Sequence, residues 1–148
     1  MKTVRRMFDE AIFVGHLGIT LERVGPGYCE TSLACPAPTL YQQSGALHAG
    51  VMTTMADHTA GGAIVSELEE GLGVVSIDLS VQFLRAARGP LRCRAESLRC
   101  GRRTAVAEAV VYRGAGEEGV VGGEEGASPL AKATVTLAVV PWTPGKAC

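Results

Sequence analysis

The most regular hydrophobic pattern of the chain lies in residues 49–68 and predicts one long helix. Apolar residues recur there at three- and four-residue steps, namely Val51, Met52, Met55, Ala56, Ala60, Ala63, Ile64 and Leu68. Small or apolar residues extend well around the helix, which is typical of a buried helix rather than one on a surface. Gly61 and Gly62 weaken a helix interior unless another element packs closely there. We expect Gly71 and Gly73 to end it.

A strictly alternating pattern in residues 75–83 predicts the clearest strand. Five apolar residues are expected to point to one side, namely Val75, Ile77, Leu79, Val81 and Phe83. Four polar residues are expected to point to the other, namely Ser76, Asp78, Ser80 and Gln82. Further strands are predicted at residues 17–24, 28–35, 91–99, 103–113 and 130–140, separated by Gly- and Pro-containing turns. Apolar residues spaced along residues 3–14 predict a short N-terminal helix.

This order of elements predicts an α+β fold. Late strands that follow one another through short turns favour an antiparallel sheet. A curved antiparallel sheet around the one long helix is the packing that we expect. The length of 148 residues suits one domain, covering residues 1–148. Residues 114–129 contain six Gly, four Glu and one Pro, and are interpreted as a flexible loop.

Composition narrows the classes of function. A net charge of -1 disfavours non-specific electrostatic binding to nucleic acid. No apolar run approaches the roughly 18 to 20 residues of a membrane span, and Asp9 and Glu10 interrupt any signal-peptide pattern. A cytoplasmic enzyme is therefore expected. The five cysteines are odd in number and form no CxxC, so neither disulfides nor zinc are expected. The three histidines, His16, His48 and His58, show no metal-binding spacing.

The candidate chemistry lies between residues 41 and 63. The first N–H groups of a helix have no internal partner and can bind a developing negative charge, so Ala49 and Gly50 are candidate donors. Asp57 lies in the middle of the apolar helix, where a carboxylate is costly unless it is paired or functional. A structural hydrogen bond remains the alternative for Asp57, and for His48 at the helix start.

Helical spacing adds a constraint on this site. Eight residues separate Ala49 from Asp57, or about 12 Å along the axis at 1.5 Å per residue. This is too far for both to contact one carbonyl group. If both act, they come from different chains, and a two-fold dimer would form two equal sites.

The same segment resembles the PaaI-like hotdog-fold acyl-CoA thioesterases. Their typical motif is Asn-x-x-Gly-x-x-His-Gly-Gly, followed by Asp or Glu in the next helix. At the matching places this chain has Gln42, Gly45, His48, Ala49, Gly50 and Asp57. The residues 76–79, 83–86 and 101–103 also look like the family's pattern. The resemblance covers roughly residues 8–113 and the final strand, and it implies the hotdog fold.

The resemblance implies a role for each matching residue. Asp57 would be the general base or the nucleophile, and the Ala49 amide would lie in the oxyanion hole where the family usually has Gly. Gln42 would replace the Asn that orients the water or the carbonyl. Ser76 would help to place the water or the thioester, and His48 would support the helix start. The family also implies a homodimer, or a homotetramer built as a dimer of dimers.

The basic segment of the chain suggests where coenzyme A would bind. Residues 85–113 contain eight Arg against Glu96 and Glu108, and guanidinium groups suit the phosphates of coenzyme A. A solvated strand face is the alternative for any one of them. The resemblance favours Arg85, Arg102 and Arg103. Coenzyme A would be part of the substrate, so no separate cofactor is expected.

Three other functions are compatible with parts of the pattern. A hotdog hydratase or dehydratase would need a His paired with an acid, in a motif that this chain lacks. A non-catalytic acyl-CoA sensor would keep the pocket but lose the base, which the presence of Asp57 disfavours. An unrelated α+β protein would use Asp57 and His48 structurally. An aryl-acetyl, a medium-chain and a polyketide-like acyl group are all compatible with the sequence.

Overall fold

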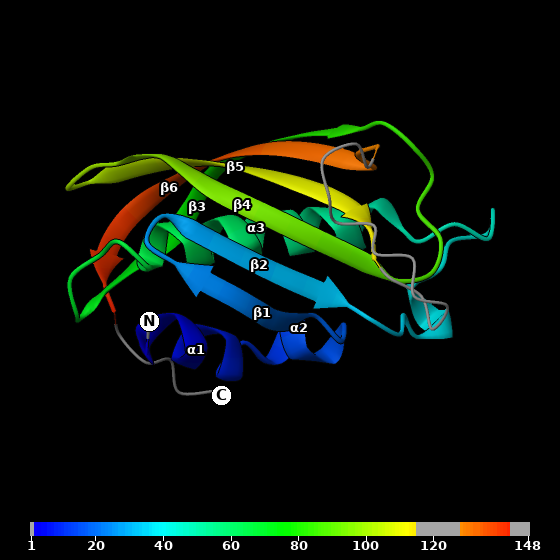
Figure 1. Cartoon of the computed structure of the whole chain (residues 1–148), viewed down its shortest axis with the longest axis horizontal. Helices are drawn as coiled ribbons and strands as arrows, with labels where there is room; N and C mark the ends of the chain where they lie inside the picture. Colours follow the sequence, from blue (N-terminus) through cyan, green and yellow to red (C-terminus); the bar gives the residue numbers. More distant parts are fainter. Residues whose placement is uncertain (1, 115–127, 143–148) are drawn as a thin grey trace.

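The computed structural model describes residues 2–114 and 128–142, and shows a curved sheet wrapped around one helix (Figure 1). Residues 115–127, most of the loop predicted to be flexible, lie outside the described residues. The elements in chain order are α1 (Lys2–Asp9), α2 (Ile12–His16), β1 (Thr20–Gly25), β2 (Tyr28–Leu33), a 3-10 turn η1 (Pro38–Leu40), α3 (Ala49–Val65), β3 (Leu72–Phe83), β4 (Leu91–Cys100), β5 (Thr104–Arg113) and β6 (Ala131–Pro141).

The six strands form one sheet in the order β1-β2-β4-β5-β6-β3, and every neighbouring pair is antiparallel. The long helix α3 lies in the concave face and contacts all six strands, as Figure 1 shows. β1 and β3 form the two edges, and the short helices α1 and α2 lie beside β1. The predicted fold class, an α+β fold with a curved antiparallel sheet around one central helix, is confirmed.

Small side chains bring the sheet close to α3. The inward positions of β4, β5 and β6 carry a row of buried alanines, namely Ala95, Ala105, Ala107, Ala109, Ala131 and Ala133. A buried hydroxyl pair joins α3 to β2, because Thr31 Oγ1 and Thr59 Oγ1 lie 2.7 Å apart and Thr59 also donates to the Met55 carbonyl. This satisfies the polar groups at a buried contact, which would otherwise destabilise the fold.

The helix α3 ends at Val65, three residues earlier than the periodicity predicts. The Ser66 hydroxyl donates to the Ala63 carbonyl at 2.6 Å and accepts the Gly27 N–H at 2.9 Å. Such local side-chain bonds compete with the helical ladder. The next amides bond three residues back, so the last turn tightens before Gly71 turns the chain at a φ of 89°.

The N-terminal helical segment is divided in two. α1 and α2 are separated at Glu10 and Ala11, and the predicted apolar face does not continue across this break. Val4 and Met7 of α1 are buried, whereas Ile12 at the start of α2 is 77% exposed. The break rotates α2 relative to α1, so Ile12 does not share the buried face of Val4 and Met7.

β3 contains a β-bulge that overturns its predicted alternation. The pairing with β6 shifts between Ser76 and Asp78, so that two residues of β3 advance against one of β6. Such an extra residue moves every later side chain to the opposite face. Ser76 therefore points toward α3 while Val75 and Ile77, 57% and 60% exposed, point away from it. Leu79 then packs against the core, so the predicted single apolar face is wrong.

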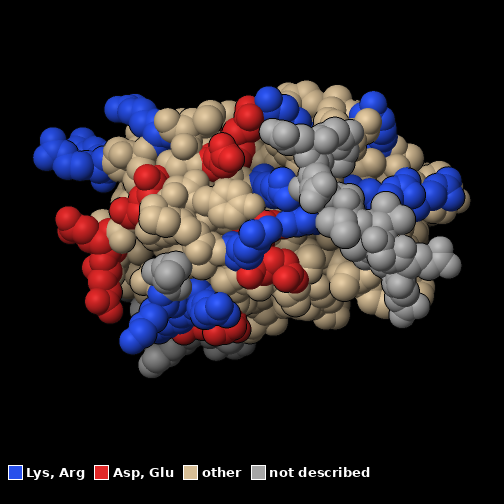
Figure 2. Space-filling view, in the orientation of Figure 1, with Lys and Arg blue, Asp and Glu red and all other residues tan. Residues whose placement is uncertain are grey.

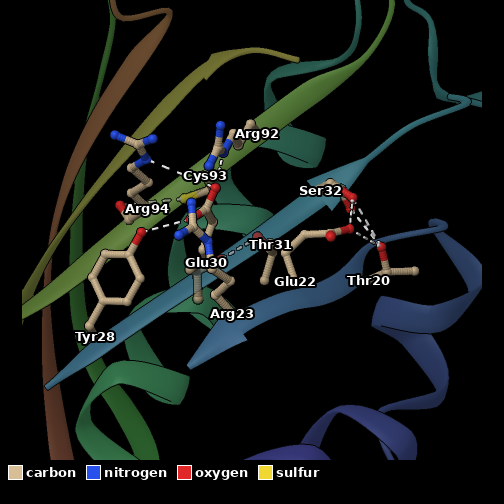
Figure 3. Close-up of polar contacts among 11 residues, drawn as sticks. Thr20, Glu22, Arg23, Tyr28, Glu30, Thr31, Ser32, Arg92, Cys93 and Arg94 are labelled. Carbon is tan, nitrogen blue, oxygen red and sulfur yellow. Dashed lines mark hydrogen bonds and ion pairs between the residues drawn. The ribbon is translucent and has the colours of Figure 1, made fainter. Parts of the chain in front are cut away.

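A charged cluster covers the outer face of β1, β2 and β4 (Figure 3). Glu30 is only 1% exposed and accepts hydrogen bonds from Arg92 Nε and from the Tyr28 hydroxyl. Arg23 Nε and Arg94 Nε lie 3.3 and 3.9 Å from its carboxylate. Figure 2 shows basic and acidic side chains close together on this face rather than a field of one sign. Two of the eight Arg of the basic segment thus contact a buried carboxylate.

Neighbouring elements pack closely against α3 at Gly62. A Cβ atom at this position would lie 2.7 Å from Cys29 Sγ on β2 and 3.2 Å from the ring of Phe8. At Gly61 the nearest atoms, on Val74 and Met7, would be 3.6 and 3.8 Å away, which is ordinary van der Waals contact. The Gly-Gly pair therefore has one member required by packing and one that is not.

These distances predict opposite effects for two neighbouring substitutions. Gly62→Ala should lower the free energy of unfolding by about 1–3 kcal/mol, because the core cannot accept the methyl group without shifting. Gly61→Ala is the matched control and should leave stability unchanged or raise it by up to about 1 kcal/mol, from the better helix propensity of Ala. Urea unfolding of both variants measures this difference. Equal losses would contradict the packing argument.

Candidate functional site

Asp57 and Ser76 form a polar pair at the middle of α3. The Ser76 hydroxyl on β3 donates to Asp57 Oδ1 at 2.6 Å, and Asp57 is half-buried. The bulge in β3 makes this contact, because it sends Ser76 toward the helix in a strand whose other polar residues point away. The pair lies at the wall of a pocket of about 410 Å³ between α3, β3 and the N-terminal helices. The structure thus brings together two of the predicted site residues.

The start of α3 is capped by His48. Its backbone is extended, and its Nδ1 accepts the Gly50 N–H at 2.9 Å. The Gly50 N–H, predicted as an oxyanion donor, is used in this bond. Within the described part of the chain, no partner is recorded for the Ala49 N–H. None of the described non-Gly residues has a positive φ, so the Ala49 methyl group is accommodated without backbone strain.

Ala49 faces a second pocket, of about 300 Å³. Gln42 and Arg85 line this pocket with Ala49, and so do Phe83 and Leu84 from the end of β3. Among residues 2–114 and 128–142, none lines both this pocket and the one beside Asp57. Within one chain, therefore, Asp57 and the helix start face different spaces, as the spacing along the helix predicts.

The three predicted coenzyme A contacts are not at one place. Arg85 lies at the Ala49 pocket, where its Nη1 donates to the Pro129 carbonyl at 2.8 Å. Arg102 and Arg103 are exposed in the turn between β4 and β5. β4 separates the two positions, and its ten residues span roughly 30 Å. One chain thus presents two basic positions at opposite ends of the sheet, and Figure 2 shows basic side chains at both ends.

His58 and Trp142 are pocket residues that the sequence reasoning did not identify. Both line the pocket beside Asp57. His58 stacks edge-on against Phe8, with ring centroids 4.5 Å apart. Burial lowers the pKa of His58 below its ordinary value of 6.5, and the adjacent Asp57 carboxylate partly offsets this. The position of His58 directly after Asp57 was the available signal, whereas nothing local indicated that Trp142 would return to α3.

The remaining candidate chemistry of the chain is sparse within residues 2–114 and 128–142. Cys29 and Cys93 are buried thiols whose pKa burial raises to about 12, while Cys35 and Cys100 are exposed. In this part of the chain no group of three His, Cys, Asp or Glu side chains could hold a metal ion. No described helix is both long enough and apolar enough to cross a membrane.

Comparisons with known proteins agree with this fold. A thioesterase family protein from Silicibacter pomeroyi has 31% identity and a TM-score of 0.82, over 94% of this chain and 96% of that one. A thioesterase from Haemophilus influenzae has 28% identity and a TM-score of 0.72, over 87% and 82%. The PaaI protein of the E. coli phenylacetic acid degradation operon shares the fold at 17% identity, with a TM-score of 0.77 over 93% and 91%.

The sheet, its central helix and these structural neighbours define a hotdog fold. The family model of the thioesterase superfamily matches residues 44–120, slightly more than half of the chain, so the chain belongs to this superfamily. A candidate esterase of Haemophilus influenzae is 34% identical over 90 residues. That match covers 60% of this chain and 64% of the relative, less than two thirds of the relative's length. The predicted family is confirmed.

The buried His58 predicts a pH dependence of stability. Because its folded pKa lies below 6.5, the unfolded chain takes up a proton first as the pH falls, and stability is lost from about pH 6.5 down to the folded pKa. His58→Phe keeps an aromatic contact with Phe8 but removes this loss. Urea unfolding at pH 7.5 and 5.5 should therefore show a smaller acid-induced decrease in the variant. The same decrease in both proteins would contradict the assignment.

Proposed function

We propose that this protein hydrolyses the thioester bond of an acyl-CoA to a free acid and coenzyme A, at a site shared between two copies of the chain. The observation that carries this proposal is the division of the polar groups along α3. Asp57, with its Ser76 partner, lines one pocket, while the capped helix start at Ala49 lines another. Each chain thus holds two half-sites rather than one complete site.

Asp57 supplies the carboxylate of the reaction. As a general base, Asp57 takes a proton from water while the water oxygen bonds to the thioester carbonyl carbon. As a nucleophile, it attacks that carbon itself, and water then hydrolyses the resulting acyl-enzyme to free the carboxylate. The tetrahedral intermediate then collapses, the C–S bond breaks, and the thiolate of coenzyme A takes up a proton. The Ser76 hydroxyl holds one Asp57 oxygen at 2.6 Å and so limits the rotation of the carboxylate. Ser76 acts in this scheme as a positioning residue.

The helix start supplies the donor for the oxyanion. The Ala49 N–H lies at the positive end of α3, and an oriented backbone donor at such a place can contribute several kcal/mol to the transition state. The bond from Gly50 N–H to His48 Nδ1 fixes the neighbouring peptide. Ala49 therefore carries this role in preference to Gly50. Gln42, which lines the same pocket, orients the carbonyl or the water.

A two-fold dimer brings the two half-sites together. β3 is an edge strand whose outward side chains include the exposed Val75 and Ile77, with Phe83 also 48% exposed near its end. An exposed apolar edge strand is a template for pairing with another chain. Pairing of β3 with β3 of a second copy would set two α3 helices side by side in opposite directions. Asp57 of one chain then faces Ala49 of the other; pairing of two such dimers would give the homotetramer.

The positions of the arginines support a proposed place for coenzyme A. Arg85 lies beside Ala49, so it belongs to the half-site that holds the thioester carbonyl. Arg102 and Arg103 lie at the other end of β4, and they reach the same coenzyme A only if they come from a different subunit. The guanidinium groups suit its pyrophosphate and 3′-phosphate. An acyl-CoA sensor is the second candidate function, and it differs in that it needs no carboxylate at residue 57.

Asp57→Asn tests the catalytic assignment. The variant keeps the size of the side chain and an oxygen that accepts from Ser76, but it cannot take a proton. We expect kcat to fall by about 10²–10⁴-fold on a panel of aryl- and medium-chain acyl-CoAs, measured as release of free thiol. Unchanged thermal unfolding provides the control for folding. Equal rates in variant and wild type would refute the role of Asp57, and saturable binding without any turnover by the wild type would favour the sensor.

Mixed dimers test whether the site is shared. Ala49→Pro removes the N–H donor at the first helical position, where Pro is tolerated and where the extended His48 backbone suits a following Pro. We expect Ala49→Pro and Asp57→Ala homodimers both to be inactive. A heterodimer, purified through two different tags, would contain one intact site in two and should recover about half of the wild-type activity. An inactive heterodimer would show that the site lies within one chain.

A further inference from the structure

The pocket beside Asp57 combines apolar walls with two buried nitrogen atoms that lack partners. Met7, Val74 and Leu137 form much of its apolar lining. His58 Nε2 and Trp142 Nε1 are both buried, and neither has a hydrogen-bond partner within the described residues. Buried polar atoms are nearly always hydrogen-bonded, and each one left without a partner destabilises the fold. Two such atoms at one pocket therefore indicate a missing partner.

The two side chains are held in place by packing rather than by hydrogen bonds. His58 stacks against Phe8 on the side of α1. The indole of Trp142 lies over Gly73, where a Cβ atom would come within 2.6 Å of its ring, and its backbone N–H donates to the Gly71 carbonyl at 2.7 Å. Neither ring can turn freely to find a partner elsewhere. Both residues also line the pocket, so a group inside the pocket is the partner that their position favours.

The chemistry of these atoms defines that group. An indole N–H can only donate, and a neutral imidazole can present its Nε2 as an N–H donor. The group that binds the indole N–H is therefore an acceptor, and the same acceptor can also bind His58 in the tautomer that carries its proton on Nε2. The pocket also carries two carboxylates, Asp57 and Glu10, of which Glu10 is paired with Arg6 at 2.7 Å. These charges disfavour an anionic ligand, so the acceptor is an uncharged oxygen.

We propose that this pocket receives an acyl group that carries an uncharged acceptor oxygen, which is bound by His58 and Trp142. The inference rests on the proposed function, because it treats the pocket beside Asp57 as the place of the acyl group. The volume of about 410 Å³ lies within the usual range for small-molecule sites, roughly 300–1,000 Å³. His58 and Trp142 are then specificity-determining residues, and they discriminate between acyl groups by the hydrogen bonds that a hydrocarbon chain cannot accept.

A series of acyl-CoAs with chains of equal length tests this assignment. Hexanoyl-CoA is compared with acyl-CoAs of the same chain length in which one methylene is replaced by an ether oxygen or a ketone, at each position from carbon 3 onward. A site built to bind an oxygen rejects the analogue that lacks it. We expect kcat/KM of the wild type to be at least about tenfold higher for the best oxygen-containing chain than for hexanoyl-CoA.

Three variants connect this preference to the two nitrogen atoms. His58→Phe keeps the contact with Phe8, and Trp142→Phe keeps an aromatic ring over Gly73. Each should lower the ratio of kcat/KM between the two substrates by about fivefold to tenfold. Met7→Leu, the matched control, changes the same pocket without removing a polar nitrogen and should leave the ratio unchanged. A merely structural role of either ring would lower kcat/KM for both substrates equally.

The outcomes separate this inference from the proposed function. Thiol release from all chains at equal rates would overturn the inference and leave the thioesterase assignment intact. An equal ratio in wild type, His58→Phe and Trp142→Phe would also overturn it. No thiol release from any acyl-CoA would refute the proposed function instead. In that case, calorimetric titration with the same substrates would still report the preference as a difference in Kd, and its absence would overturn the inference too.

Discussion

The close approach of α3 to the sheet is the constraint on which the rest of the structure depends. A helix can lie this deep in the concave face only if the facing side chains are small. Alanines on β4, β5 and β6 and Gly62 on the helix meet this condition. The scarcity of aromatic residues, 5% of the chain, fits this condition. Without this approach, the Thr31–Thr59 pair would not close, and β3 would not come within reach of Asp57.

The depth of the helix also explains how a carboxylate is tolerated in an apolar segment. One side of α3 is packed against the sheet, while Thr53, Thr54, Asp57 and His58 are only partly covered. Asp57 is therefore half-buried and has the Ser76 hydroxyl as a partner. A full desolvation penalty is avoided, and the group keeps access to a pocket. The Ala49 pocket lies at the start of the same helix, half a helix length from Asp57.

The β-bulge in β3 is the local feature that most changes the chemistry of the site. It directs Ser76 inward in the first half of the strand, and Leu79 inward in the second half. Val75 before the bulge and Ile77 within it are left on the outside near the edge of the sheet. One extra residue thus produces both the polar partner of Asp57 and an exposed apolar edge. The Asp57–Ser76 hydrogen bond and the exposed apolar edge of β3 therefore have the same origin.

Periodicity and motif by themselves determined the six strands, the long helix, the fold class and the family of this protein. These features follow from spacing along the chain, which the sequence records directly. The separation of Asp57 from the helix start was equally available, because a helix has a constant rise per residue. What only the tertiary structure decided depends on contacts between distant segments. Two of these contacts are the register shift between β3 and β6 and the bond from the Gly50 N–H to the His48 side chain. Two others are the bond from Arg92 to Glu30 and the placement of Trp142 at the same pocket as His58. No local pattern encodes them, since each is set by which side chains pack together.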